Sequence, residues 1–386
     1  MDRYREVVVY IAGFTGPLAG NMVLALLGTL GSEWNVESVD VLLSIPAFMF
    51  PFALVQLVSG AISNAYDRRS TVLLGLSVYA IGTVLASASG SLEFFIGARV
   101  VQGLGYAFVN PILVAMLSDI AGPNRQGQVM GYFGSSTTAG VSVGPLLGGA
   151  FADINWRFAF LTVTALSIAM IALVWFLFRG ERRGDRRLSL SAVFSDISGA
   201  VRHRRISRLS ASGFLAFMAF AGVISFVAEY METGPLALGP EEVGIALSVS
   251  GFVGIFVAPL AGRLVDRRGA ICCVTVGFLT SAIGAFALSF ADEYLHFLVL
   301  LLITGSGGAF IWASLLTMVV AVPPSMKNTS SSVFNSSRFL GYAISPLVFA
   351  PIYLATGFDQ LMILCASIGL VALLLVFLSR DGPKEE

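Results

Sequence analysis

Charged residues are scarce in this chain of 386 residues. Asp, Glu, Lys and Arg together make up 12% of the sequence, whereas about 25% is usual for a water-soluble protein. Hydrophobic residues make up 56%, and apolar stretches of about 20 residues, each long enough to cross the hydrocarbon layer of a bilayer, recur along the whole length. The composition excludes a soluble protein. It predicts about twelve membrane-spanning helices, with little chain left for a soluble domain.

Cysteine and histidine are also rare, with three and two residues respectively. The cysteines lie inside apolar stretches and are interpreted as small buried hydrophobic residues. The histidines lie in or near loops. No His, Glu and Asp cluster suited to a metal is present, and no glycine-rich phosphate loop or nucleophile with an acid–base pair. The sequence therefore predicts no metal, no cofactor and no enzyme.

The net charge is zero, but the charges are unevenly distributed. Most Lys and Arg residues fall at the termini and in alternate loops, whereas the opposite loops carry mainly Asp and Glu. The positive-inside rule then places both termini in the cytoplasm. The most basic loop, 179–208, is compatible with nucleic acid in composition, but its place between spans favours the bilayer surface as its partner. The start runs directly into the first span, so no removable signal peptide is expected.

The sequence repeats itself in two halves. Gly60 in GAISNAYDRR matches Gly262 in GRLVDRRGA, and glycines in VVQGLGYAF and LITGSGGAF match in the same register. Each half has an even number of spans, so the two copies keep the same orientation in the membrane. We expect an N-terminal six-helix bundle over 1–178, a cytoplasmic linker over 179–205 and a C-terminal six-helix bundle over 206–386.

The stretch 131–149, GYFGSSTTAGVSVGPLLGG, combines regularly spaced glycines with a proline inside one span. Glycines let another helix backbone approach closely, and a proline bends the helix. This spacing, with Gly140, Gly144 and Pro145, resembles the fifth-helix antiporter motif of the major facilitator superfamily. The resemblance implies two six-helix bundles related by a pseudo-two-fold axis, with a substrate site near the midplane and helices that rock on each other.

A second resemblance lies in the loop after the second span of each half. Gly262 to Gly269, GRLVDRRG, resembles the superfamily's loop motif, and the copy beginning at Gly60 departs from it. In the family this loop closes the cytoplasmic side. Together with the fifth-helix motif and the acid at the close of the fourth helix, the resemblance implies gating roles here for Gly60, Asn64, Arg68, Asp119, Gly140, Gly144, Pro145, Gly262, Asp266, Arg267 and Arg268. Asp119 is expected to pair with Arg68 or Arg125. The alternative interpretation is ordinary loop charge.

Arg99, in RVVQGLG, resembles the fourth-helix motif of the superfamily. A charge inside a bilayer is costly and usually faces the interior of the bundle. The family resemblance makes Arg99 a proton-coupling or structural residue, and the alternative is a side chain that reaches the outer interface. The first and fourth spans lack the acidic residue that many exporters of this family carry there. Glu229 is therefore the candidate proton carrier, because burial can change the pKa of a carboxyl group.

Arg338 is a cation inside the eleventh span, with no acid near it in sequence. It either pairs with an acid of another helix as part of a gate or attracts an anionic group of a substrate. Other polar residues in apolar spans are candidates for substrate binding or, alternatively, for hydrogen bonds between helices. The set of candidate substrate-binding residues comprises Asn21, Gln102, Asn110, Ser135, Thr138, Trp312, Asn335 and Arg338.

These features predict a secondary transporter that moves a small amphiphilic or anionic molecule by alternating access. Proton-coupled export is the leading interpretation. An importer of small organic anions is the alternative within the same class, and a transporter-like ligand sensor is the alternative outside it. We expect a multi-pass protein of the plasma membrane that works as a monomer with protons and a small-molecule substrate, and without nucleic acid.

Overall fold

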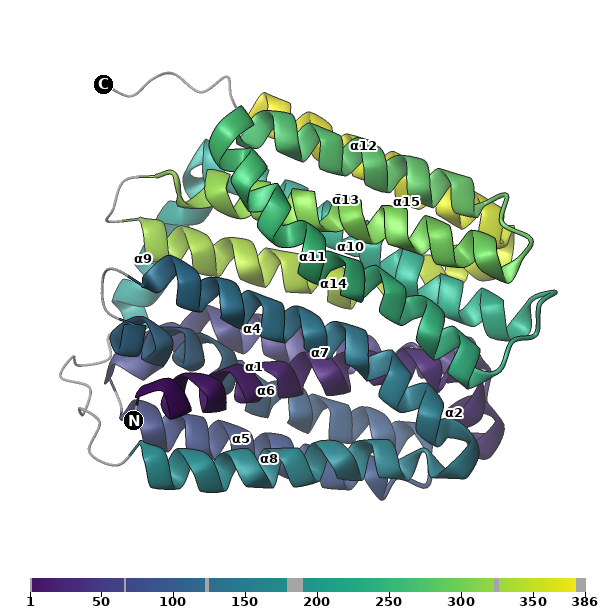
Figure 1. Cartoon of the computed structure of the whole chain (residues 1–386), viewed down its shortest axis with the longest axis horizontal. Coiled ribbons are helices and arrows are strands. Elements are labelled where there is room, and N and C mark those ends of the chain that lie inside the picture. Colours follow the sequence, from purple (N-terminus) through teal and green to yellow (C-terminus); the bar gives the residue numbers. More distant parts are fainter. Residues whose placement is uncertain (1, 66, 122–124, 179–189, 323–325, 380–386) are drawn as a thin grey trace. The chain divides into compact units, whose positions relative to one another are not determined.

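The computed structural model describes residues 2–65, 67–121, 125–178, 190–322 and 326–379, and these residues fold as helices joined by short turns (Figure 1). No strand occurs in the part of the chain so described. The helices, in chain order, are α1 (Asp2–Met22), η1 (Val23–Ala25), α2 (Leu27–Trp34), α3 (Ser38–Val41), α4 (Ser44–Ala65), α5 (Arg68–Ser87), α6 (Leu92–Ala121), α7 (Gln126–Asn155), α8 (Arg157–Leu177), α9 (Leu190–Arg202), α10 (Arg204–Thr233), α11 (Pro240–Arg268), α12 (Ala270–Leu288), α13 (Tyr294–Val320), α14 (Lys327–Thr356) and α15 (Phe358–Leu378).

Eleven segments within the described residues are long and apolar enough to cross a membrane. The helix α7 has 30 residues but is not among them. Its Gly, Ser and Thr residues lower its mean hydropathy, and these are the residues with which membrane helices pack closely against one another. We therefore count α7 as a spanning helix on its length, which is about 45 Å at 1.5 Å per residue.

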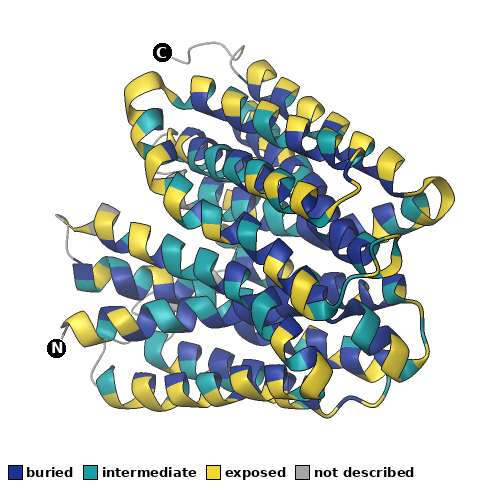
Figure 2. Cartoon of the chain, turned by 45° about the vertical axis from the view of Figure 1, so that its right-hand side comes forward, coloured by how far each residue is buried: buried dark blue, intermediate teal, exposed yellow. Residues whose placement is uncertain are grey.

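Two compact units make up the chain. Unit 1 comprises Met1–Leu188 with Met231–Gly251, and unit 2 comprises Ser189–Tyr230 with Phe252–Glu386. The end of α10 and the first half of α11 thus pack with the first half of the chain, beyond the boundary expected near 206. The bounds 1–178, 179–205 and 206–386 stay a prediction. The helices carry exposed residues along one side and buried residues along the other (Figure 2), as expected where part of each surface faces lipid.

The internal repeat is visible as the same helix contact inside each unit. In unit 1, a Cβ added to Gly75 of α5 would lie 2.9 Å from the carbonyl oxygen of Gly105 in α6. In unit 2, a Cβ added to Gly277 of α12 would lie 2.9 Å from the carbonyl oxygen of Gly307 in α13. These four glycines hold equivalent places in the two halves. The repeat inferred from sequence is therefore a repeat of backbone packing as well.

Candidate functional site

The seam between α1 and α7 is built from backbone rather than from interlocking side chains. A Cβ on Gly144 would lie 2.6 Å from the carbonyl oxygen of Leu18, and one on Gly140 would lie 3.1 Å from the backbone N of the same residue. Gly148 meets the backbone of Met22 in the same way. Gly140, Gly144 and Gly148 therefore let α1 lie directly on α7 (Figure 1).

The other edge of α7 contacts the segment Met231–Gly251 of the same unit. A Cβ on Gly244 would lie 2.5 Å from the carbonyl oxygen of Pro145, and Ser248 Oγ donates to the carbonyl oxygen of Ser142 over 2.6 Å. At the end of α10, Glu232 accepts a hydrogen bond from the backbone N–H of Gly28, 2.6 Å away, in the first turn of α2. A carboxylate suits the positive N-terminus of a helix. These contacts were not predictable from sequence, because they join residues far apart in the chain.

Side chains of α5 and α6 hold the carbonyl groups of α1. Pro17 has no N–H, so the carbonyl oxygen of Gly13 lacks its usual helical partner. The hydroxyl of Tyr106 donates to this oxygen over 2.8 Å, and the hydroxyl of Tyr79 donates to the carbonyl oxygen of Thr15 over 2.7 Å. Both tyrosines are buried. Sequence analysis did not select them, although Pro17 inside a span was a signal that a donor was needed.

Arg99 continues this set of contacts toward the end of α1. It is fully buried, and its guanidinium donates to the carbonyl oxygens of Ala19 at 3.0 Å and Gly20 at 3.3 Å. These oxygens lie where α1 gives way to η1. Arg99 also donates to Gln102 Oε1 over 2.9 Å and lies 4.7 Å from the ring centroid of Phe48. The side chain thus turns inward rather than toward an outer interface, and its proton-coupling role stays a prediction.

Two ion pairs lie at one end of unit 1. Asp119 pairs with Arg68, which is one of the two partners expected from sequence. Arg125, the other expected partner, instead holds Glu6 through two contacts of 3.1 Å and 3.3 Å. Glu6 was not foreseen as a site residue, and it is buried in the first helical turns of α1. The gating role of the Arg68–Asp119 pair stays a prediction.

The two copies of the loop motif differ in structure. Gly60 and Asn64 lie in the last turns of α4, where the side chains are outside the described part of the structure. In unit 2, Asp266, Arg267 and Arg268 are exposed, and no ion pair joins them to the residues that are described. Gly262 makes no close contact with another helix among the described residues, and its gating role stays a prediction. Within the described chain, nothing lies within 4 Å of the place where its Cβ would be.

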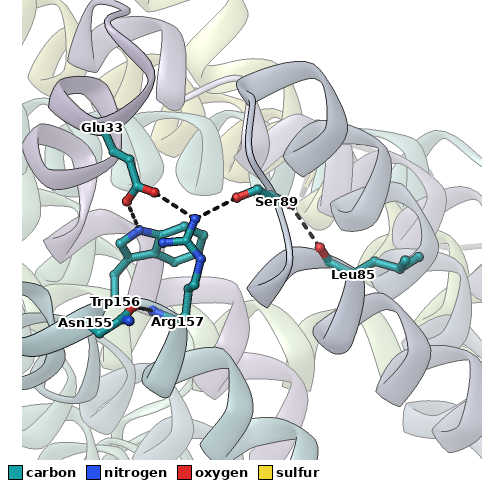
Figure 3. Close-up of polar contacts among 6 residues, drawn as sticks. All are labelled: Glu33, Leu85, Ser89, Asn155, Trp156 and Arg157. Carbon is teal, nitrogen blue, oxygen red and sulfur yellow. Dashed lines mark hydrogen bonds and ion pairs between the residues drawn. The ribbon is translucent and has the colours of Figure 1, made fainter.

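The opposite end of unit 1 carries a polar cluster formed by Glu33, Ser89, Trp156 and Arg157 (Figure 3). Arg157 Nη2 lies 2.7 Å from Glu33 Oε1 and donates to the carbonyl oxygen of Ser89 over 3.1 Å. Trp156 Nε1 donates to the other oxygen of Glu33. Burial by itself would raise the pKa of Glu33, but the hydrogen bonds from Arg157 and Trp156 and the Arg157 charge outweigh it, so this pKa is lowered.

Arg338 lies among aromatic rings in unit 2. The centre of its guanidinium is 3.8 Å from the ring centroid of Trp312, 4.2 Å from that of Phe339 and 4.6 Å from that of Phe217. Arg338 and Trp312, two of the residues predicted from sequence to bind a substrate, are thus brought together. Asn335, another of them, precedes Arg338 by one helical turn on α14 and is half-buried.

The remaining candidates are dispersed. Asn21 is buried and donates to the carbonyl oxygen of Pro17 over 2.9 Å. Asn110, Ser135 and Thr138 are half-buried, and Thr138 Oγ1 donates to the carbonyl oxygen of Gly134. Glu229 is 3% exposed, so it lies inside the protein rather than in solvent at a helix end. Their roles in binding or proton coupling stay predictions.

A family model described as Major Facilitator Superfamily matches residues 9–346 and 209–386. The chain belongs to this family of membrane transporters. It is a multi-pass protein of the plasma membrane and a transporter rather than an enzyme.

Particular relatives agree with this assignment. The chain is 24% identical over 329 residues to the "Multidrug efflux protein YfmO" of Bacillus subtilis, covering 85% of this chain and 81% of that protein. Its fold is similar to that of the human organic anion transporter MFSD10, with a TM-score of 0.76, 19% identity and coverage of 97% and 99%. It is also similar to that of a bacterial homologue of the human lysosomal transporter Spinster, with a TM-score of 0.80, 16% identity and coverage of 98% and 96%.

Proposed function

We propose that this protein is a secondary active transporter that exports a small amphiphilic or anionic molecule by alternating access, coupled to protons. Both termini are cytoplasmic, and the working unit is a monomer. The bilayer, a small-molecule substrate and protons are its partners.

The seam between α1 and α7 is the observation that carries this proposal. Gly140, Gly144 and Gly148 remove the side chains from one face of α7, so the contact with α1 has few projections that must disengage when the helices move. Alternating access requires such relative movement of helices at a fixed site. The antiporter-like spacing of these glycines favours exchange, and export is the activity in the printed name of the relative from Bacillus subtilis.

Glu229 is the proposed proton carrier. It is a carboxyl group inside the spanning helix α10 that is 3% exposed, and acidic residues inside spanning helices are typical of proton relays in transporters. We assign Arg99 to the same proton coupling, because its guanidinium donates hydrogen bonds to carbonyl oxygens at the end of α1.

Flux in proteoliposomes tests the proposal. The purified full chain is reconstituted with candidate amphiphilic compounds, and substrate-dependent counterflow and uptake driven by an imposed pH gradient are measured. We expect counterflow and gradient-driven flux in the wild type. Glu229→Gln should keep counterflow and lose the response to the pH gradient. Absence of counterflow with every compound that binds would support a ligand sensor, and accumulation in the opposite direction would support an importer of organic anions.

A further inference from the structure

We propose that Arg338 and the aromatic residues around it form a subsite for a planar aromatic anion, such as an arene carboxylate or sulfonate. The inference rests on the proposed transport function and specifies the class of its cargo. The site lies wholly within unit 2 and is formed by α10, α13 and α14. We call Arg338, Phe217, Trp312 and Phe339 the arginine cage.

The cage stabilises a positive charge without neutralising it. Rings of Trp312, Phe339 and Phe217 lie 3.8–4.6 Å from the guanidinium centre, and aromatic faces attract a cation at such distances. Aromatic rings attract the charge but leave the guanidinium's five N–H groups without the oxygen acceptors that would neutralise it. Those donors match the two oxygens of a carboxylate or sulfonate in a fork-like arrangement.

No acidic residue of these helices is placed to occupy the donors. α13 and α14 contain neither Asp nor Glu. On α10, Glu229 is twelve residues beyond Phe217, which is about 18 Å along the helix axis. Arg338 accordingly makes no hydrogen bond or ion pair with any residue that the structure describes, and its Nε is enclosed without a partner. A buried charge without a partner is stabilised when an anion binds and its oxygens accept the free N–H groups.

The cage is only partly enclosed. Arg338, Phe217 and Trp312 are half-buried, and the two aromatic residues pack against the core of unit 2 while part of each side chain stays exposed. The rings of Phe217 and Phe220 have centroids 6.4 Å apart with an interplanar angle of 56°. A planar aromatic ligand can extend this tilted array while its anionic group meets the guanidinium, because aromatic pairs prefer offset and tilted geometries. An alkyl anion lacks this second contact.

Binding to the purified full chain in detergent tests the assignment, with three probes of similar size. These are 2-naphthoate, its neutral analogue 2-naphthamide, and the non-aromatic anion decanoate. Thermal stabilisation and isothermal titration measure affinity. We expect 2-naphthoate to bind at least about tenfold more tightly than 2-naphthamide, since hydrogen bonds to charged groups are the stronger ones. Decanoate should also bind more weakly than 2-naphthoate.

Variants separate charge from stacking. Arg338→Gln should abolish the preference for 2-naphthoate over 2-naphthamide, and Arg338→Lys should retain part of it. Trp312→Leu should weaken both aromatic probes while leaving decanoate nearly unchanged. Arg204→Gln, an exposed arginine at the start of α10, is the matched control and should bind like the wild type.

An unchanged preference for 2-naphthoate in a folded Arg338→Gln protein overturns the subsite, as does equal binding of all three probes to the wild type. If the subsite fails this test but other compounds still show counterflow, the proposed transport function stands. Conversely, Arg338-dependent binding of 2-naphthoate without flux of any compound would overturn the proposed transport and leave the subsite standing.

Discussion

Asp67 and Gly269 hold equivalent positions before α5 and α12 and begin these helices by different means. Asp67 has a φ of −61°, and its carboxylate accepts a hydrogen bond of 2.9 Å from the backbone N–H of Ser70. Gly269 has a φ of 85° and uses no side chain. A positive φ favours glycine, whereas a side-chain cap requires a residue such as Asp. The departure of the first loop from the family pattern therefore replaces one helix start with another.

Replacement of Asp67 by Ala should remove this cap. Loss of an N-cap costs about 1 kcal/mol, so Asp67→Ala should lower the midpoint of thermal unfolding in detergent. Asp67→Ser retains an acceptor at the same position and serves as the control. Equal unfolding midpoints for Asp67→Ala and the wild type would contradict the capping role.

The α1–α7 seam predicts a strong effect of bulk at Gly144. Leu at this position would drive a side chain into the backbone of Leu18, so Gly144→Leu should abolish flux while the protein still inserts into the membrane. Gly131→Leu on the same helix is the control, because nothing lies within 4 Å of the Cβ position there. Flux assays of the two variants at equal membrane abundance provide the comparison. Normal flux in Gly144→Leu would refute the mechanical role of the seam.

Tyr106 and Pro17 should be coupled energetically. Tyr106→Phe leaves the carbonyl oxygen of Gly13 buried without a donor, which costs about 1–3 kcal/mol. Pro17→Ala restores the backbone N–H that a helix normally directs at that oxygen. The double variant should therefore lose less stability than the sum of the single variants. Unfolding midpoints of all four proteins measure the cycle, and strict additivity would argue against the assigned hydrogen bond.

Glu33 predicts a stability change at acidic pH. Glu33 lies between the first two spanning segments, and its pKa in the folded protein is below the reference value of 4.5. A lowered pKa contributes stability that is present above the unfolded pKa and is lost as the pH falls through the folded one. The difference in unfolding midpoint between wild type and Glu33→Gln should therefore be largest near neutral pH and shrink below about pH 4.5.

The control for this prediction is Glu37→Gln, since Glu37 is exposed and makes no side-chain cap. Its unfolding midpoint should follow that of the wild type at every pH. A constant difference between wild type and Glu33→Gln from neutral to acidic pH would exclude the electrostatic contribution of the cluster in Figure 3.

Several features of the fold were predictable because they depend on residues that are close together in the sequence. Apolar length predicts a spanning helix, and matched glycines such as Gly105 and Gly307 predict the repeat of close packing. The spacing of Gly140 and Gly144 likewise predicted a backbone contact before its partner, Leu18, was known. Gly262 shows the limit of this reasoning, since a glycine permits a close approach without supplying a neighbour.

The identity of the partners was not predictable, because it depends on which helices pack together. Arg125 and Arg68 were equivalent candidates for Asp119 in sequence, and packing gave Asp119 to Arg68 and Glu6 to Arg125. Arg99 was compatible with an interface or an interior, and packing enclosed it against the carbonyl groups of α1. Tyr106 was one aromatic residue among many until the helices placed its hydroxyl at Gly13.

The sequence by itself determined that this is a helical membrane protein with an internal duplication, and to which family it belongs. It could do so because hydropathy and glycine spacing are properties of one helix at a time. Only the tertiary structure decided which buried charges acquire acceptors, as Arg99 does, and which remain among aromatic rings, as Arg338 does. The reason is physical: the free energy of a charge inside a membrane protein depends on the groups within a few ångströms, and these groups come from helices distant in the chain.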